Sequence, residues 1–503
     1  MNLAVILKKI VGTSSDYWLT RHLFQRALGL TYLIAFLAVI NQFRPLLGER
    51  GLLPVSQFVQ RVPFARSPSL FFFFPNDTAF LILGAVGLAL AIVATIGISE
   101  RFGWGVSVGV WFLMWLIYLS FVNVGQTFYS FGWETMLLEA GFLAIFLGPR
   151  KVAPSVITIF LLRWMLFRVM FGAGLIKLRG DSCWKDYTCL TYHHETQPMP
   201  NPLSWYFHLA PLWFHKLGVL YNHFTELIVP FFYFAPFPLS VIAGGLTLFF
   251  HGFLFVSGNF AFLGFLTMVL AIAAFNDKIL SKIIPITIPK TVVSGAFHLT
   301  AIYALTLLVA ALSIGPIVNL FSPRQAMNRS FEPLHLVNTY GAFGSITKTR
   351  FEIVIEGTIE EVSENSEWKE YEFKAKPTSL SRSPPQYAPY HLRLDWLMWF
   401  EGINSSYKER LGGYVHSPWF VHLLAKFLEA DKGVLKLIRE SPFGEERPNA
   451  IRALVYQYNF TTPEERRQTG NIWKRQFIGT YYPAVSLDDP EFRSTLQEYG
   501  WEY

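Results

Sequence analysis

Long apolar runs separated by short polar segments dominate the first 320 residues of the chain. A helix needs about 20 mainly apolar residues to cross the hydrocarbon core of a bilayer. Two weaker runs, 133–147 and 260–275, are short enough to be tilted or half-inserted. With them we predict nine spans, and eight is the alternative. The seven stronger runs are residues 24–40, 79–99, 104–122, 154–176, 217–234, 239–256 and 296–312.

The pattern changes after about residue 321. Residues 351–358 alternate between apolar and polar positions and are rich in β-branched side chains, and 371–375, 451–460 and 473–482 are similar. Helical spacing returns in residues 394–400 and 418–438. The sequence therefore predicts two parts. Residues 1–320 form a polytopic α-helical membrane domain, and residues 321–503 form an extramembrane α+β domain that contains an antiparallel sheet.

Composition agrees with a membrane protein. Hydrophobic residues make up 52% of the 503 positions and charged residues only 15%, against about 25% in soluble proteins. The net charge of +7 is spread along the chain without a dense basic block, which argues against a nucleic-acid partner. The residual basicity fits loops beside anionic lipid, so membrane lipid is the partner that composition predicts.

Polar chemistry is concentrated just after one apolar run, in a predicted external loop over residues 177–216. Lys177 is a candidate catalytic base, because partial desolvation at a membrane boundary lowers the pKa of an amine. Arg179 could then bind an anion, and Asp181 could orient the lysine. The alternative is a lysine at a helix end that extends toward the membrane surface.

The same loop carries other reactive side chains. Trp184, His193, His194 and Glu195 follow, but the adjacent histidines lack the spacing of a zinc motif, so we predict neither a metal site nor a cofactor. Cys183 and Cys189 are the only cysteines. They would form a disulfide in an oxidising compartment, and two reduced thiols are an equal alternative.

Ionisable residues also occur inside the predicted spans, where they are costly and usually pair within the bundle. Two acids on one run and two bases on the next suggest ion pairs between neighbouring helices. These pairs could simply hold the helices together, and a transport role is a weaker possibility without visible inverted repeats. The predicted membrane-buried polar residues are Glu134, Glu139, Arg163, Arg168, His223, Glu226 and His251.

Several long strings make the chain similar to the lipase maturation factor family. The resemblance implies a polytopic membrane protein whose C-terminal domain lies on the lumenal side and which helps secreted lipases become active. The cysteine content is low for animal members, which suggests a prokaryotic or distant member whose exported client need not be a lipase. The strings lie at residues 17–32, 48–54, 133–148, 172–202, 222–230, 256–266, 335–347 and 390–400.

The resemblance also sets the expected location. It implies the endoplasmic reticulum membrane in a eukaryote and the cytoplasmic membrane in a bacterium. A weak excess of basic residues on the N-terminal side places the cysteine loop and the C-terminal domain outside the cytosol. The leading hypothesis is therefore a chaperone-like maturation factor that acts on clients beyond the membrane.

A second resemblance bears on mechanism. Residues 174–184, GLIKLRGDSCW, are similar to the helix-end motif of vitamin K-dependent carboxylases, in which a lysine followed by Leu, Asp and Trp supplies the base. That resemblance implies a membrane enzyme with Lys177 as the base, acting on a lipid-soluble or peptide substrate. It is the alternative to the maturation role.

Overall fold

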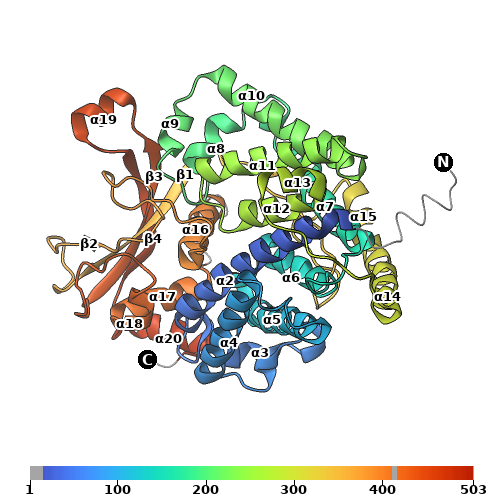
Figure 1. Ribbon diagram of the computed structural model, residues 1–503. Coiled ribbons are helices and arrows are strands. Elements are labelled where there is room, and N and C mark those ends of the chain that lie inside the picture. The colour runs from blue at the N-terminus through green and yellow to red at the C-terminus, as the bar shows by residue number, and fades with distance from the viewer. Residues whose placement is uncertain (1–14, 410–415, 502–503) are drawn as a thin grey trace.

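The computed structural model describes residues 15–409 and 416–501, and it contains a helical bundle followed by a small sheet domain (Figure 1). Among these residues, six helices are long and apolar enough to cross a membrane. The bent pair Leu263–Ala274 and Asp277–Ile283, which changes direction by 117°, would make a seventh. The six are α2 (Trp18–Leu47), α4 (Asp77–Thr95), α5 (Trp104–Val124), α7 (Val156–Arg179), α11 (Leu239–Ser257) and α14 (Ala296–Leu312) with α15 (Ile314–Phe321).

Nine spans are not confirmed, because two predicted runs form shorter elements. The run at 133–147 becomes α6 (Gly132–Ala144), whose 13 residues extend about 20 Å. Almost all of α6 is buried among its neighbours, so it is shielded from lipid and does not need full membrane length. The run at 217–234 is divided into α10 (Leu212–His223), a π-helical turn (Phe224–Ile228) and a 3-10 segment (Val229–Phe234).

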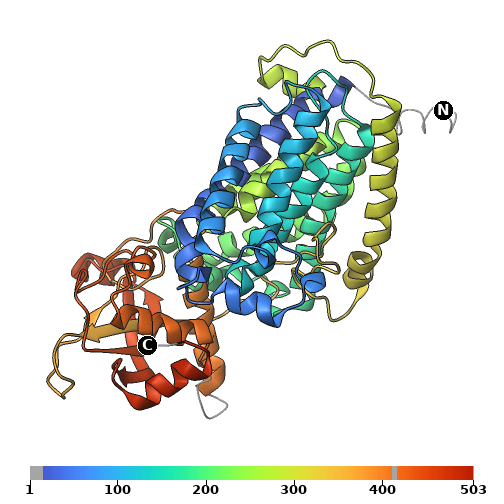
Figure 2. The same ribbon diagram turned by 90° about the horizontal axis from the view of Figure 1, so that it is seen from below.

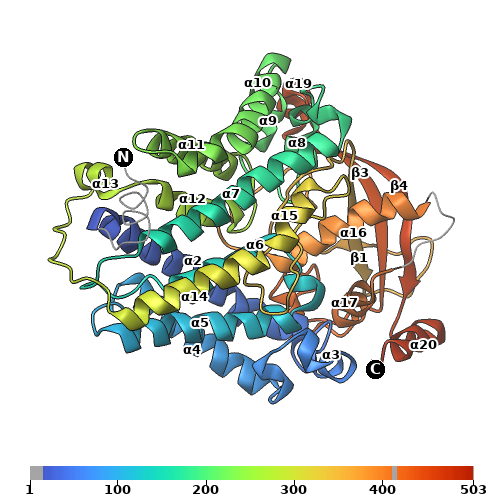
Figure 3. The same ribbon diagram turned by 90° about the vertical axis from the view of Figure 1, so that its right-hand side faces the viewer.

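The helices differ in how far they are covered by protein. Two thirds of the apolar window of α7 is buried, whereas 28% is buried in α4 and in α14–α15. α7 is therefore central, and α14 lies along the outside of the bundle (Figure 3). Short helices α3 (Val55–Arg61), α8 (Leu190–Thr196), α9 (Ser204–His208), α12 (Leu263–Ala271) and α13 (Asp277–Ile283) complete this part.

The C-terminal part contains the predicted antiparallel sheet, with strand order β2-β1-β3-β4. The register places Val354 opposite Leu454 and Tyr456 opposite Phe477. α16 packs on β1 and α17 on β3. The strands are β1 (Arg350–Thr358), β2 (Lys369–Glu370), β3 (Ala450–Phe460) and β4 (Trp473–Val485). The helices are α16 (Arg393–Glu409), α17 (Pro418–Leu428), α18 (Lys432–Leu435), α19 (Pro463–Thr469) and α20 (Pro490–Glu498).

The sheet domain lies at one end of the bundle, and α2 begins at the opposite end (Figure 2). At its start, α2 donates the backbone N–H groups of Trp18 and Leu19 to Asp277. Near its other end, the Gln42 amide donates to the carbonyl of His391 and accepts from the N–H of Arg393, just where α16 begins. α2 therefore runs from the far end of the bundle to the sheet domain.

One buried ion pair crosses between the bundle and the C-terminal part. The Arg393 guanidinium lies 2.7 Å from Oε1 of Glu134 on α6, and both side chains are fully buried. Tyr118 of α5 donates to the same carboxylate, and Arg393 also lies 3.5 Å from the ring centre of Tyr129. Because an uncompensated charge would be left inside the protein if the two parts separated, this contact opposes their separation.

Two histidines also lie at this interface. His391 is 3.6 Å from Glu134, and Nδ1 of His422 on α17 lies 3.0 Å from the carbonyl oxygen of Leu52 in the bundle. Burial lowers the pKa of each histidine from 6.5 to about 4, and nearby Arg393 adds to the effect at His391. Both side chains are therefore neutral in the folded protein near pH 7.

We predict that Arg393→Ala destabilises the protein by about 3–5 kcal/mol, because it leaves Glu134 buried without its cation. The double variant Glu134→Leu/Arg393→Met should lose less, since no charge remains in the apolar site. Thermal unfolding of the full chain in lipid nanodiscs measures both. Arg493→Ala is the control, because its ion pair with Asp488 is exposed and it should change little. Equal loss in Arg393→Ala and the control would contradict the role of the buried pair.

We also predict that stability falls on acidification from about pH 6.5 toward pH 4. Below 6.5 the unfolded chain binds protons at His391 and His422 while the folded chain does not, so the free energy of unfolding decreases. Each histidine contributes up to about 1.4 kcal/mol at roughly pH 5.5. The double variant His391→Gln/His422→Gln should show a shallower decrease in melting temperature between neutral and acid pH. An unchanged slope would show that other groups cause the sensitivity.

Candidate functional site

Lys177, at the last turn of α7, forms a buried ion pair. Its Nζ donates to both carboxylate oxygens of Glu226, each at 2.6 Å, and the two side chains are 4% and 6% exposed. The Asn222 amide donates to Oε2 of Glu226 at 2.9 Å, and the Trp184 ring centre lies 5.3 Å from Nζ. The lysine is thus held within the protein by a carboxylate and does not extend into solvent.

Local sequence explains why Glu226 can reach it. Glu226 lies in the π-helical turn that interrupts the helix after α10, and Pro230 follows four residues later. A proline cannot donate the backbone hydrogen bond that an α-helix requires, so regular helix cannot continue through this point. The wider turn brings Glu226 and Asn222 toward α7, which the π-helical turn contacts.

Lys177 and Glu226 lie on the wall of a cavity of about 360 Å³. Its lining comes from α6, α7, α11, α12, α16 and the backbone segment 340–345, so both parts of the chain enclose it. His193 and His251 bring further polar groups to the wall. Most of the lining is apolar or aromatic. It includes Phe131, Trp133, Met136, Met170, Trp184, Phe260, Phe343, Trp396, Trp399 and Phe400.

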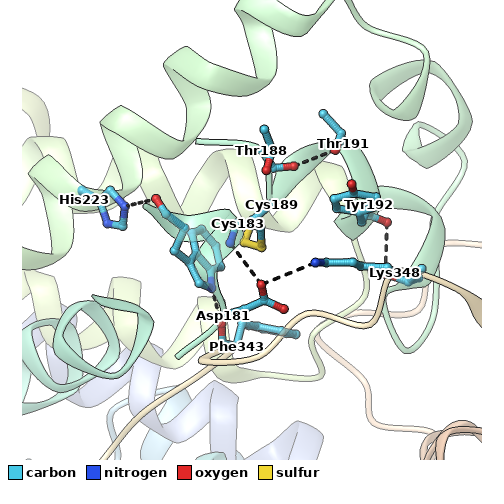
Figure 4. The surroundings of a disulfide bond; sticks show 11 residues. Asp181, Cys183, Thr188, Cys189, Thr191, Tyr192, His223, Phe343 and Lys348 are labelled. Carbon is cyan, nitrogen blue, oxygen red and sulfur yellow. Dashed lines mark hydrogen bonds and ion pairs between the residues drawn. A yellow bond between two sulfur atoms is a disulfide. The ribbon is translucent and has the colours of Figure 1, made fainter. Parts of the chain in front are cut away.

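The other two members of the candidate catalytic group bind elsewhere. Arg179 donates to Gln325 at 2.7 Å in an exposed position. Oδ1 of Asp181 accepts from the backbone N–H of Cys183 at 3.0 Å and lies 3.8 Å from Lys348 (Figure 4). Asp181 therefore caps the short turn that contains Cys183, and the structure gives Lys177 a different acidic partner, Glu226.

The two cysteines form a disulfide, and both are buried (Figure 4). Trp184, next to Cys183, donates from its indole N–H to the carbonyl of Phe343, and its own carbonyl lies 3.0 Å from Nε2 of His223. The disulfide loop is therefore attached both to α10, which carries His223, and to the segment before β1. Trp184 in this loop is also the residue whose ring packs over Nζ of Lys177.

The rest of the predicted external loop connects the bundle to the sheet. Glu195 accepts from the backbone N–H of Phe460 on β3 at 2.6 Å. Arg350 of β1 donates to the carbonyl oxygens of Glu195 and Pro198, at 3.0 and 3.1 Å. Burial lowers the pKa of His193 to about 4 and holds that of His194 well below its usual value, so both are neutral near pH 7. No cluster of metal-ligand residues occurs among the described residues.

The other residues that the sequence predicted to be buried in the membrane form contacts with partners other than Lys177. Arg168 pairs with Glu139 of α6, and Asn338 and Tyr340 also donate to that carboxylate. Arg163 lies toward the other end of α7, where its Nε donates to the carbonyl of Ala273. His251 Nε2 lies 3.3 Å from the sulfur of Met170.

Sequence reasoning missed several residues of this site. Asn222 lies in the string 222–230, and His391 and Arg393 lie in the string 390–400, so the resemblance contained them without assigning a role. Arg350, Glu352 and Lys376 form a further buried ion-pair group in the sheet domain. Arg350 is the first residue of β1 and Glu352 lies within it, so charges at the start of an otherwise alternating strand were the one available signal.

Comparison with known proteins matches both parts of the chain. A family model described as the lipase maturation factor transmembrane domain matches residues 19–282, and one described as the lipase maturation factor C-terminal domain matches residues 336–483. Lipase maturation factor 1 of Homo sapiens is 39% identical over 97% of this chain and 91% of its own length.

Relatives of lower identity are also lipase maturation factors. Lipase maturation factor 2 of Rattus norvegicus is 29% identical over 95% of this chain and 85% of its own length. No solved structure matches the chain. The family models cover most of the chain, and the human relative aligns over nearly all of it. On this evidence, the chain is an integral membrane protein that belongs to the lipase maturation factor family.

Proposed function

We propose that this chain is a membrane-embedded maturation factor that assists the folding or assembly of secreted lipases or other exported clients. The observation that carries the proposal is the nearly full-length similarity to lipase maturation factor 1, which spans the bundle and the sheet domain alike. A shared membrane anchor alone would leave the C-terminal domain unmatched. The similarity therefore supports a common role for the whole assembly.

The geometry supports a passive, chaperone-like mechanism. The sheet domain is joined to the bundle by the buried Glu134–Arg393 pair and by the hydrogen bonds of Arg350 to the carbonyls of Glu195 and Pro198, which follow the disulfide. A domain held in this way acts as a fixed surface at one end of the bundle. It would protect apolar surface on a client or orient subunits during assembly, and neither task requires a bond to be made or broken.

The enzyme alternative receives less support. Lys177 is bound by both oxygens of Glu226, while Arg179 and Asp181 contact Gln325 and Lys348. The comparisons lend no support to a carboxylase.

We further propose that the sheet domain and the disulfide lie on the non-cytosolic side. The compartment beyond the membrane would be the endoplasmic reticulum lumen in a eukaryote and the periplasmic or outer side in a bacterium. Two features support this orientation. The segment that follows the disulfide contacts the sheet domain, so the disulfide and the sheet domain lie on the same side of the membrane. Disulfides persist in oxidising compartments, which lie outside the cytosol.

Deleting the gene should lower the specific activity of secreted lipases and raise their aggregated fraction, while lipase transcript levels stay constant. The reason is that clients would fold without the surface that this factor supplies. Activity per unit of lipase protein in the medium, together with sedimentation of the retained lipase, measures both. Unchanged specific activity and unchanged aggregation of lipases and of the other exported proteins would contradict the maturation role.

Re-expression of variants separates the two functions. The double variant Lys177→Met/Glu226→Gln removes both charges together, so no unpaired charge remains in the bundle. A passive factor carrying it should restore lipase activity at equal expression. Loss of rescue with normal expression and folding would favour chemistry at Lys177.

Because the chain has only two cysteines, its redox state can be counted directly. We predict that denatured protein from rapidly quenched cells reacts with no maleimide before reduction and with two after it. Cys183→Ser should react once without reduction, which controls for access and labelling efficiency. Two reactive thiols in unreduced wild-type protein would contradict the non-cytosolic placement of the loop.

A further inference from the structure

The cavity beside Lys177 has features that a maturation surface does not need. Its volume of about 360 Å³ falls within the range of about 300–1,000 Å³ that is typical of small-molecule sites. It lies between the transmembrane helices and α16 of the sheet domain and is partly open to the outside. A folded client protein is too large for such a space, whereas a small molecule or a single lipid chain fits it.

The charge of the cavity restricts that occupant. Among its described lining residues, Lys177 and Glu226 are the only Lys, Arg, Asp or Glu side chains, and they neutralise each other. A charged ligand would add an uncompensated charge to a mostly apolar space, which is strongly unfavourable. A neutral ligand meets no such penalty.

The cavity nevertheless offers hydrogen bonds. An ammonium group has three donors, and Lys177 uses two on the carboxylate of Glu226. Nδ1 of His251 and the indole N–H groups of Trp133 and Trp396 are buried without a hydrogen-bond partner among the described residues, and all three residues line the cavity. Buried polar groups normally have partners, and these three atoms have almost no accessible surface, so they mark unsatisfied polarity in the wall without themselves facing the cavity.

The remainder of the lining suits a hydrocarbon chain. The Trp133 and Trp396 rings are in edge-to-face contact with centres 4.9 Å apart, and Phe131 stacks on Trp133. Aromatic walls of this kind bind apolar chains through contact area, because they exclude water from it.

We propose that this cavity binds a neutral amphipathic lipid, whose head carries a hydroxyl or carbonyl group and whose hydrocarbon chain lies against the aromatic wall. The head is placed near Lys177 and Asn222, where an acceptor oxygen can take the third ammonium donor. Long-chain alcohols and monoacylglycerols share this chemistry. Bound lipid would also bridge the bundle and α16, since both contribute to the wall.

The test uses the full chain in nanodiscs and a monoacylglycerol that carries a photoreactive diazirine in its acyl chain. Saturable labelling should appear on peptides that line the cavity, and non-saturable labelling on the outward-facing α14 provides the internal reference. Monooleoylglycerol or oleyl alcohol should compete, and the stronger of the two identifies the preferred head. Oleyl sulfate and oleyltrimethylammonium, which are permanently charged, should compete roughly tenfold less well or worse.

A matched pair of variants tests the location. Gly264 lines the cavity, and a Cβ atom added there meets no atom closer than 3.8 Å, so Gly264→Leu introduces its side chain at an uncrowded position of the wall. Gly245 lies on an exposed face of α11 with nothing within 4 Å. Gly264→Leu should abolish saturable labelling, and Gly245→Leu should leave it unchanged. Equal labelling in both variants, each checked for normal melting temperature, would overturn the proposal.

A third variant tests the charge argument. Glu226→Gln leaves the charge of Lys177 uncompensated, so oleyl sulfate should become the strongest competitor. The proposal would also be overturned if the charged competitors matched the neutral ones in the wild-type protein, or if this substitution left their order unchanged. These measurements report binding alone, so their outcome is independent of the maturation role.

Discussion

The contact between Glu134 and Arg393 is the constraint on which the rest of the architecture depends. Glu134 lies on a short helix inside the bundle, and Arg393 begins the helix that carries the sheet domain. Both are fully buried, so neither charge can reach water while the two parts stay together. The Gln42 side-chain amide donates to the carbonyl of His391 and accepts from the N–H of Arg393, which fixes the same junction from a second helix. The bundle and the sheet domain are therefore one structural unit, and a cavity can form between them.

The same principle, a buried charge held by one partner, shapes the site around Lys177. The lysine and Glu226 are 49 positions apart in the sequence, and the π-helical turn before Pro230 brings them together. Trp184 in the disulfide loop packs over Lys177. Glu195, which follows that loop, is hydrogen-bonded to Arg350 and to the backbone of the sheet. Membrane helices, the loop and α16 of the sheet domain thus converge on one neutral, mostly apolar space. In such a site the polar residues serve to select a ligand without net charge.

Periodicity could predict most of the elements but few of their partners. The six long helices and the strands β1, β3 and β4 follow directly from apolar runs and from alternation. Glu139 and Arg168 lie on consecutive helices, so the sequence already suggested pairs between these two runs. By contrast, Glu134 and Arg393 are 259 positions apart, and no local pattern links them. The span count was not confirmed because hydropathy cannot show that α6 is surrounded by protein and so does not need to match the membrane thickness.

The central claim is that the sheet domain is held in one position on the bundle, and a distance measurement tests it most directly. Arg50 on the bundle and Gln476 on β4 are both exposed, so spin labels on cysteines introduced there should not disturb the core. Electron–electron double resonance in nanodiscs should give one narrow distance distribution, which broadens when Arg393 is replaced by alanine. A broad distribution in the otherwise unaltered protein would show a domain that moves freely, and would contradict the account.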